Sequence, residues 1–104
     1  MIRHARSRAE PVIVSTKGKF VEEIRRGKNP KGFPADVVRS AQRKLAILNA
    51  AVALGELRTP PGNRLEELRG DRAGQHSIRI NDQWRICFVW TDGGPEYVEI
   101  VDYH

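Results

Sequence analysis

The chain has 104 residues, a length that suits one small domain with a single hydrophobic core. Its 18 Lys and Arg against 13 Asp and Glu give a formal net charge of +5, which favours a polyanionic partner, nucleic acid first. A lone cysteine excludes an internal disulfide, and no apolar run is long enough for a membrane span or a signal peptide, so we expect a cytoplasmic protein with no membrane partner.

The first third of the chain predicts one strand and one short helix. Residues 1–10 are polar and basic, and we expect them to form a flexible extension to a single domain over residues 11–104. Residues 12–14 predict a short strand, and residues 19–26 predict a helix with Phe20, Val21 and Ile24 on its apolar side. Two glycines and two prolines predict a loop over residues 27–34.

Residues 34–54 give the strongest helix signal. Pro34 suits the first helical turn, where its missing N–H costs nothing, and Gly55 is expected to end the helix. Apolar side chains recur at the three- and four-residue spacing of one continuous stripe: Val38, Ala41, Leu45, Leu48 and Val52. Lys44 lies among the basic residues on the other side of this helix. That basic side is either exposed to solvent alone or binds nucleic acid.

Residues 70–90 predict a β-hairpin. Residues 77–80 and 83–90 alternate in polarity, with Trp84, Ile86, Phe88 and Trp90 on one face and Arg85, Cys87 and Val89 on the other. Arginine recurs at positions 72, 79 and 85, and a guanidinium on a strand suits a bidentate grip on phosphate better than an apolar core. We interpret Cys87 as a small buried hydrophobe and not as a nucleophile.

The chain ends on a third predicted strand. Residues 92–95 predict a turn, and residues 96–104 predict the last strand, with Tyr97, Val98, Ile100 and Val101 as its apolar residues and with Asp102, Tyr103 and His104 at its end. Together these elements predict an α+β domain, with an N-terminal strand and two helices packed on a small antiparallel sheet.

The run LRGDRAGQHSIRINDQWRICF at residues 68–88, together with the terminal DYH, resembles the HigB branch of the RelE-like toxins. These are the toxin halves of bacterial type II toxin–antitoxin pairs, and the resemblance covers roughly residues 36–104. It implies a compact RelE-like fold and a metal-independent, ribosome-dependent endoribonuclease that cleaves mRNA without a cofactor. It also implies a HigA-like helix-turn-helix antitoxin as partner, with operator DNA bound only through the toxin–antitoxin complex.

Cleavage of RNA without a metal uses the neighbouring 2′-OH as nucleophile and needs a base, an acid and cations for the phosphate. The resemblance assigns proton transfer to His104, whose imidazole titrates near neutral pH; the alternative is a terminal histidine without a role. By strand alternation Asp102 shares the face of His104 and orients it or shares the proton. We expect the His104 imidazole to lie within reach of a phosphate held by Arg79 and Arg85, with Asp102 aimed the same way.

The remaining site residues have competing interpretations. Tyr103 stacks on a base or packs in the core. Arg85 matches the family's phosphate-binding arginine, and its replacement by alanine is then expected to leave the fold mostly intact; the alternative is an ion pair with a carboxylate such as Glu99. Further basic residues are candidates for RNA binding: Arg64, Arg69, Arg72, Arg79 and Lys44.

One position departs from the family pattern. Related HigB proteins commonly carry a histidine before the glycine–aspartate–arginine run, and here that position holds Glu66. A carboxylate can act as base, although its reference pKa of about 4.3 makes it weaker than histidine at neutral pH. Either Glu66 replaces the histidine, or the proton work rests on His104 and Asp102.

Two other functions stay open for the same fold. One is a toxin that poisons DNA gyrase, which the terminal DYH disfavours. The other is a non-catalytic module that only binds its antitoxin, which Glu66 keeps open. No group of Cys and His has the spacing of metal ligands, so we expect no metal.

Overall fold

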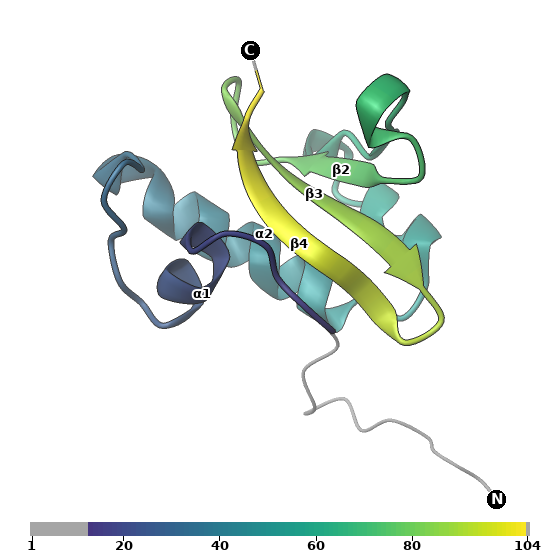
Figure 1. The fold of residues 1–104 in the computed structure, drawn as a ribbon, viewed down its shortest axis with the longest axis horizontal. Helices are drawn as coiled ribbons and strands as arrows, with labels where there is room; N and C mark the ends of the chain where they lie inside the picture. The colour runs from purple at the N-terminus through teal and green to yellow at the C-terminus, as the bar shows by residue number, and fades with distance from the viewer. Residues whose placement is uncertain (1–12, 104) are drawn as a thin grey trace, which may run out of the picture.

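The structure is a computed structural model that describes residues 13–103 and shows an antiparallel sheet with helices on one side (Figure 1). The helices are α1 (Phe20–Arg25) and α2 (Val38–Ala50), and the strands pair in the order β1 (Glu66–Glu67), β2 (His76–Arg79), β3 (Trp84–Thr91) and β4 (Gly94–Asp102). Short 3-10 turns occupy the connections: η1 (Ala35–Val37), η2 (Leu54–Arg58), η3 (Pro61–Asn63) and η4 (Gly70–Arg72). The predicted α+β class is therefore confirmed, whereas the predicted extension over residues 1–10 lies outside the described residues.

The strand predicted at residues 12–14 is wrong for the part that is described. Residues 13–17 run beside β4 and pair with it through one parallel bridge, between Thr16 and Val98. The Val14 N–H donates to the Pro95 carbonyl at 2.8 Å and the Lys17 N–H to the Val98 carbonyl at 2.9 Å. A regular ladder does not develop, because β4 carries a bulge at Tyr97, whose φ of 54° breaks the pleat.

The helix predicted over residues 34–54 begins later and ends earlier. The turn η1 precedes α2, and the chain leaves the helix at Ala51, whose ψ is 133°. The Val52 N–H bonds the Glu56 carboxylate at 3.1 Å in place of a helical carbonyl, and the chain then turns back to bury Leu57. Gly55 consequently lies inside η2, and Val52, expected in the apolar stripe, is 48% exposed.

The core lies between α1, α2 and one face of the sheet, which α2 crosses from behind in Figure 1. The hairpin's predicted apolar face is confirmed there, except that Trp90 is only half-buried. Phe20 and Phe33 close one end of the core against Trp84, with ring centroids 6.0 and 4.8 Å from it. Among residues 13–103, no helix has the length and apolar character needed to cross a bilayer.

The other face of the sheet carries the polar side chains of the hairpin. The register places Ser77 opposite Cys87, Cys87 opposite Glu99, and Arg79 opposite Arg85. Ser77, Cys87 and Arg85 are nevertheless buried. Ser77 and Arg85 can be buried on this face because these two residues form hydrogen bonds with one another. These hydrogen bonds are the basis of the candidate site.

Asn63 fixes the loop that leads to this face. It is fully buried; its Nδ2 donates to the carbonyls of Leu57 and Thr59 at 3.1 and 3.2 Å, and its Oδ1 accepts from Lys44 Nζ at 2.5 Å. Burial lowers the pKa of Lys44, and the charges of Arg43 and Arg79 lower it further. The turn at residues 59–63 is thus tied to α2 through the Asn63 side chain.

We expect Asn63→Ala to lower the free energy of unfolding by about 2–4 kcal/mol, because two carbonyls and an ammonium lose their partner. Urea unfolding measures the change. Asn29→Ala, in the exposed loop before α2, is the control and should shift the free energy by less than about 0.5 kcal/mol. Equal midpoints for the two variants would show that the Asn63 bonds contribute nothing net.

Candidate active site on the open face of the sheet

Arg85 is the centre of the site. It lies on β3, and its side chain is almost completely buried, yet two of its three nitrogens, Nε and Nη2, find acceptors on the open face. Its Nε donates to Ser77 Oγ at 2.7 Å, and its Nη2 donates to the Arg64 carbonyl at 2.6 Å and to the Ser77 carbonyl at 3.4 Å. Neutral acceptors hold the guanidinium in one orientation without cancelling its charge.

Glu66 and Tyr103 flank this guanidinium. Glu66 Oε1 lies 3.5 Å from Arg85 Nη2, and its side chain is 51% exposed, so the carboxylate faces solvent as well as the cation. The Arg85 Cζ atom lies 5.2 Å from the centroid of the Tyr103 ring, a cation–π contact. The Tyr103 N–H donates to the Gln83 carbonyl at 2.6 Å and so fixes the chain beyond β4. The structure thus brings together three of the residues predicted as catalytic.

Asp102 does not join them. It pairs with Trp84 across β3 and β4, and Trp84 points into the core, so alternation places Asp102 on the helix side of the sheet. There its Oδ2 accepts from Gln83 Nε2 at 3.0 Å. The expected grouping of Asp102 with Arg85 is therefore not found, because the register gives that face to Tyr103. His104 lies outside the described residues.

The arginines predicted to bind RNA surround the site, and two of them are engaged by acids. Arg79 Nη2 lies 2.5 Å from Asp82 Oδ1, and Arg72 Nη1 lies 3.3 Å from Glu99 Oε1. Arg72 Nη1 also donates to Gln75 Oε1 at 3.0 Å. The ion pair of Arg85 with Glu99, the alternative drawn from the sequence, does not form, because Arg72 takes Glu99 and Glu66 takes Arg85.

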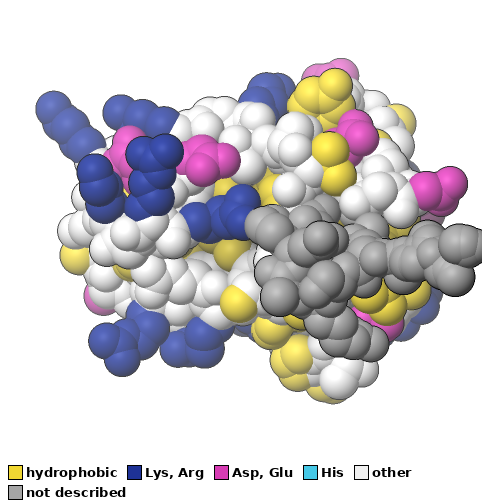
Figure 2. All heavy atoms as spheres, turned by 90° about the horizontal axis from the view of Figure 1, so that it is seen from below, with side chains coloured by type: hydrophobic (Ala, Val, Ile, Leu, Met, Phe, Trp, Pro, Cys, Tyr) yellow, Lys and Arg dark blue, Asp and Glu magenta, His cyan; other side chains and the backbone are white. Residues whose placement is uncertain are grey.

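The other predicted cations have different surroundings. Arg64 is exposed in a left-handed conformation with φ 47°, and its carbonyl is an acceptor of Arg85. Arg69 is exposed and forms no ion pair within residues 13–103. Other Lys and Arg side chains lie away from the site: Figure 2 shows several of them gathered at the end of the molecule where α1 lies.

Cys87 lies between Arg72 and Arg85 but has no nucleophilic character. Burial raises the pKa of its thiol, Glu99 raises it further, and the two arginines only partly oppose this. The thiol therefore stays protonated at neutral pH, as expected of a small buried hydrophobe. Among residues 13–103 there is no group of three or more His, Cys, Asp or Glu that could hold a metal.

Sequence reasoning missed Ser77, which provides two of the acceptors of Arg85. The available signal was its position. Once the turn at Asn81 and Asp82 is placed, Ser77 lies diagonally across the hairpin from Arg85 and on the same face.

Comparisons with known proteins concern most of this chain. A family described as the RelE-like toxin of the type II toxin–antitoxin system HigB matches residues 17–104. The chain is 44% identical over 78 residues to "Toxin HigB-1" of Vibrio cholerae serotype O1, a match that covers 74% of this chain and 82% of that protein. It is 34% identical over 73 residues to "Endoribonuclease HigB" of Proteus vulgaris, covering 70% and 78%.

The burial of Arg85 changes what its replacement should do. We expect Arg85→Ala to lower the free energy of unfolding by about 2–4 kcal/mol, because Ser77 Oγ and the Arg64 carbonyl lose a charged donor. Glu66→Gln should cost only about 0–1 kcal/mol, since its ion pair is half-exposed. Urea unfolding of both variants, with Arg69→Ala as an exposed control, checks this. An unchanged midpoint for Arg85→Ala would show that the guanidinium does not support the fold.

Proposed function

The chain belongs to the RelE-like HigB toxin family of type II toxin–antitoxin systems, and from this premise we propose that it is an endoribonuclease that cleaves mRNA on the ribosome. The observation that carries the proposal is the group of Arg85, Glu66 and Tyr103 on one face of the sheet. A fixed cation, a solvent-facing carboxylate and an aromatic ring are the groups that a phosphodiester with its flanking base would meet.

Arg85 binds the scissile phosphate in this proposal. Its described hydrogen bonds use Nε and Nη2, and Nη1 donates none within residues 13–103. The 2′-oxygen attacks the phosphorus, the bond to the 5′-oxygen breaks, and negative charge grows on the non-bridging oxygens. A guanidinium already held in place stabilises that charge without having to reorganise.

Glu66 and His104 then divide the proton transfers. The Glu66 carboxylate lies beside the cation that binds the phosphate, and it takes the 2′-OH proton. His104, which follows Tyr103 in the sequence and carries the role implied by the resemblance, protonates the departing 5′-oxygen. Asp102 lies on the helix side of the sheet and takes no part in these proton transfers.

In this proposal the ribosome holds the mRNA in the orientation that cleavage requires. A carboxylate is a weak base at neutral pH, so productive cleavage requires a substrate held in an orientation close to that of the reaction. As a member of a toxin–antitoxin family, the chain has an antitoxin as partner. We infer that this antitoxin is a HigA-like helix-turn-helix protein, that operator DNA is bound only by the complex, and that the toxin acts in the cytoplasm with the ribosomes.

A non-catalytic module that only binds antitoxin is the second candidate function. The ion pair between Glu66 and Arg85 favours it, because the carboxylate occupies one edge of the cation that would hold phosphate. The two functions differ in whether an mRNA is cut.

Expressed without its antitoxin, the protein should stop bacterial growth, and co-expression of the antitoxin should restore it. Purified toxin should cut an mRNA bound to ribosomes, with little cutting of the same mRNA free in solution, as read by primer extension. Normal growth at high expression together with intact ribosome-bound mRNA would favour the non-catalytic module and overturn the proposal.

The proton assignment predicts a pattern across three variants. Deletion of His104 and Glu66→Gln should each lower single-turnover cleavage on the ribosome by roughly 10²–10⁴-fold. Asp102→Asn, which keeps the shape of the side chain on the other face, should change the rate by less than about tenfold. A large loss of activity in Asp102→Asn, together with full activity in Glu66→Gln, would assign the proton transfer to the Asp102 side chain and not to Glu66.

A further inference from the structure

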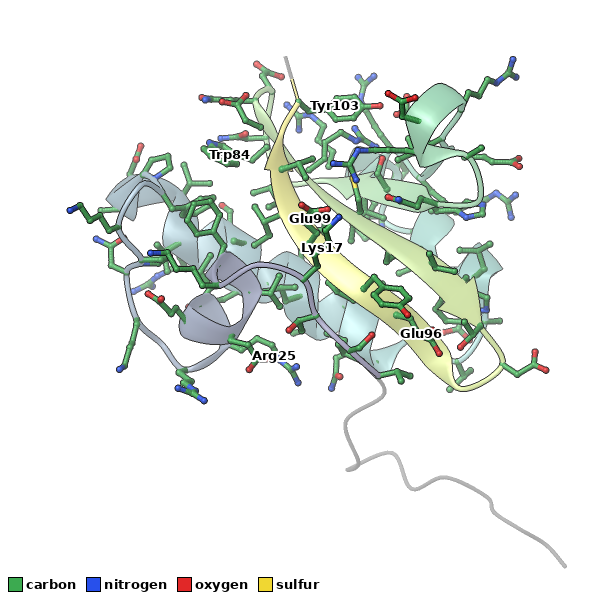
Figure 3. All side chains as sticks on the ribbon, in the orientation of Figure 1. Lys17, Arg25, Trp84, Glu96, Glu99 and Tyr103 are labelled. Carbon is green, nitrogen blue, oxygen red and sulfur yellow. The ribbon has the colours of Figure 1, made fainter. Side chains whose placement is uncertain are left out.

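A groove beside the Arg85 site has no part in the cleavage mechanism. It runs between residues 16–20 and β4 and consists of two adjoining hollows of about 500 and 280 Å³, which share Lys17 and Glu99 as lining residues. Tyr97 lines the larger hollow, and we call the whole the Tyr97 groove. Figure 3 shows Lys17 and Glu99 next to one another over the middle of β4, with Tyr103 toward one end of the strand and Glu96 toward the other.

Tyr97 is held in an unusual conformation that exposes its ring. Its φ of 54° lies in the left-handed region that non-glycine residues rarely adopt, and its side chain is 58% exposed. The backbone is fixed there because the Tyr97 N–H donates to Ser15 Oγ at 2.8 Å and the Val98 N–H to the Ser15 carbonyl at 3.0 Å. Bulges are frequent beside active sites, where they redirect a side chain, and here the redirected group is a phenol facing solvent.

The charges of the groove suit a nucleotide. Glu99 is paired with Arg72 at 3.3 Å, whereas Lys17 forms no ion pair with any of residues 13–103. The groove therefore offers a cation for phosphate and an aromatic face for a base. The oxygens of Glu99 and Gln75 each contact Arg72 Nη1 and keep acceptor capacity for an exocyclic amino group. Single-stranded RNA is bound through such combinations of stacking and backbone charge.

The groove continues the face that carries the catalytic group. Tyr103, Val101 and Glu99 alternate onto that face of β4, so Glu99 lies about 13 Å from Tyr103 at roughly 3.3 Å per residue. Glu99 also pairs with Cys87, two residues after Arg85 on β3. An RNA strand whose scissile phosphate lies on Arg85 can reach the groove without leaving the sheet.

We propose that the Tyr97 groove is a nucleotide subsite for the RNA strand that is cleaved at Arg85, an inference that rests on the proposed function. A base flanking the cleavage point stacks on Tyr97, its phosphate contacts Lys17, and Glu99 or Gln75 accepts a hydrogen bond from the base. The acceptors favour bases that carry an amino group over uracil. The subsite gives affinity and base preference and takes no part in bond breaking.

Binding of a fluorescent, non-cleavable 2′-O-methyl oligoadenylate of about ten nucleotides, followed by anisotropy, tests the subsite. Loss of one stacked base should weaken the Kd of Tyr97→Ala by about 5- to 150-fold, whereas Tyr97→Phe keeps the ring and should bind like the wild type. Lys17→Gln should reduce the slope of log Kd against log salt by about 0.7, the value for one phosphate contact on a single strand. The matched oligouridylate should bind more weakly than the oligoadenylate to the wild type and to Tyr97→Phe, and this difference should shrink in Tyr97→Ala.

The outcomes separate this inference from the proposed function. Wild-type affinity in Tyr97→Ala, with wild-type cleavage of ribosome-bound mRNA, overturns the subsite and leaves the nuclease standing. Binding that depends on Tyr97 in a protein that cuts no mRNA supports the subsite and overturns the nuclease. If Tyr97→Ala instead loses the antitoxin and keeps the oligonucleotide, the groove belongs to the protein partner and the subsite is overturned. Urea unfolding of Tyr97→Phe and Tyr97→Ala confirms that both are folded.

Discussion

A buried guanidinium organises this domain. Arg85 is only 6% exposed, and its position depends on Ser77 across the hairpin and on the carbonyl of Arg64 before β1. Burial of a cation is costly unless its donors are satisfied, so this pairing sets the position of β1 and the loop that Asn63 secures. The same interaction brings Glu66 and Tyr103 to the cation, and one contact network therefore supports both the fold and the site.

The two faces of the sheet have different tasks. The face toward α1 and α2 holds the apolar core, and it leaves Asp102 on its margin. On the open face Arg72, Arg79 and Arg85 are each paired with a carboxylate, so the local field is set by individual partners and not by the net charge. The excess of Lys and Arg lies over the helical end, where it can attract a polyanion as a whole without defining a phosphate position (Figure 2).

The sequence predicts the sheet better than it predicts the site. Alternation at Ile78, Ile86 and Phe88 identified the core face, because a period of two is a local property. The end of α2 was missed, since the exit at Ala51 depends on the Glu56 side chain and on burial of Leu57. At the candidate site, residue types and the resemblance predicted roles for Arg85, Glu66 and Tyr103, and the structure brings these three side chains together. Their grouping without Asp102 needed the strand register, and the bulge at Tyr97 has no signal in local sequence.

Coupling between Arg85 and the scissile phosphate tests the central claim most directly. Sulfur is placed at a non-bridging oxygen of that phosphate, and single-turnover cleavage on the ribosome is compared for the wild type and Arg85→Lys. If the guanidinium binds that oxygen, sulfur at this position should slow cleavage by the wild type by on the order of tenfold. The same sulfur should slow cleavage by Arg85→Lys far less, because lysine cannot reproduce the planar two-donor contact. An equal slowing of both proteins would contradict the account and leave Arg85 with a structural role alone.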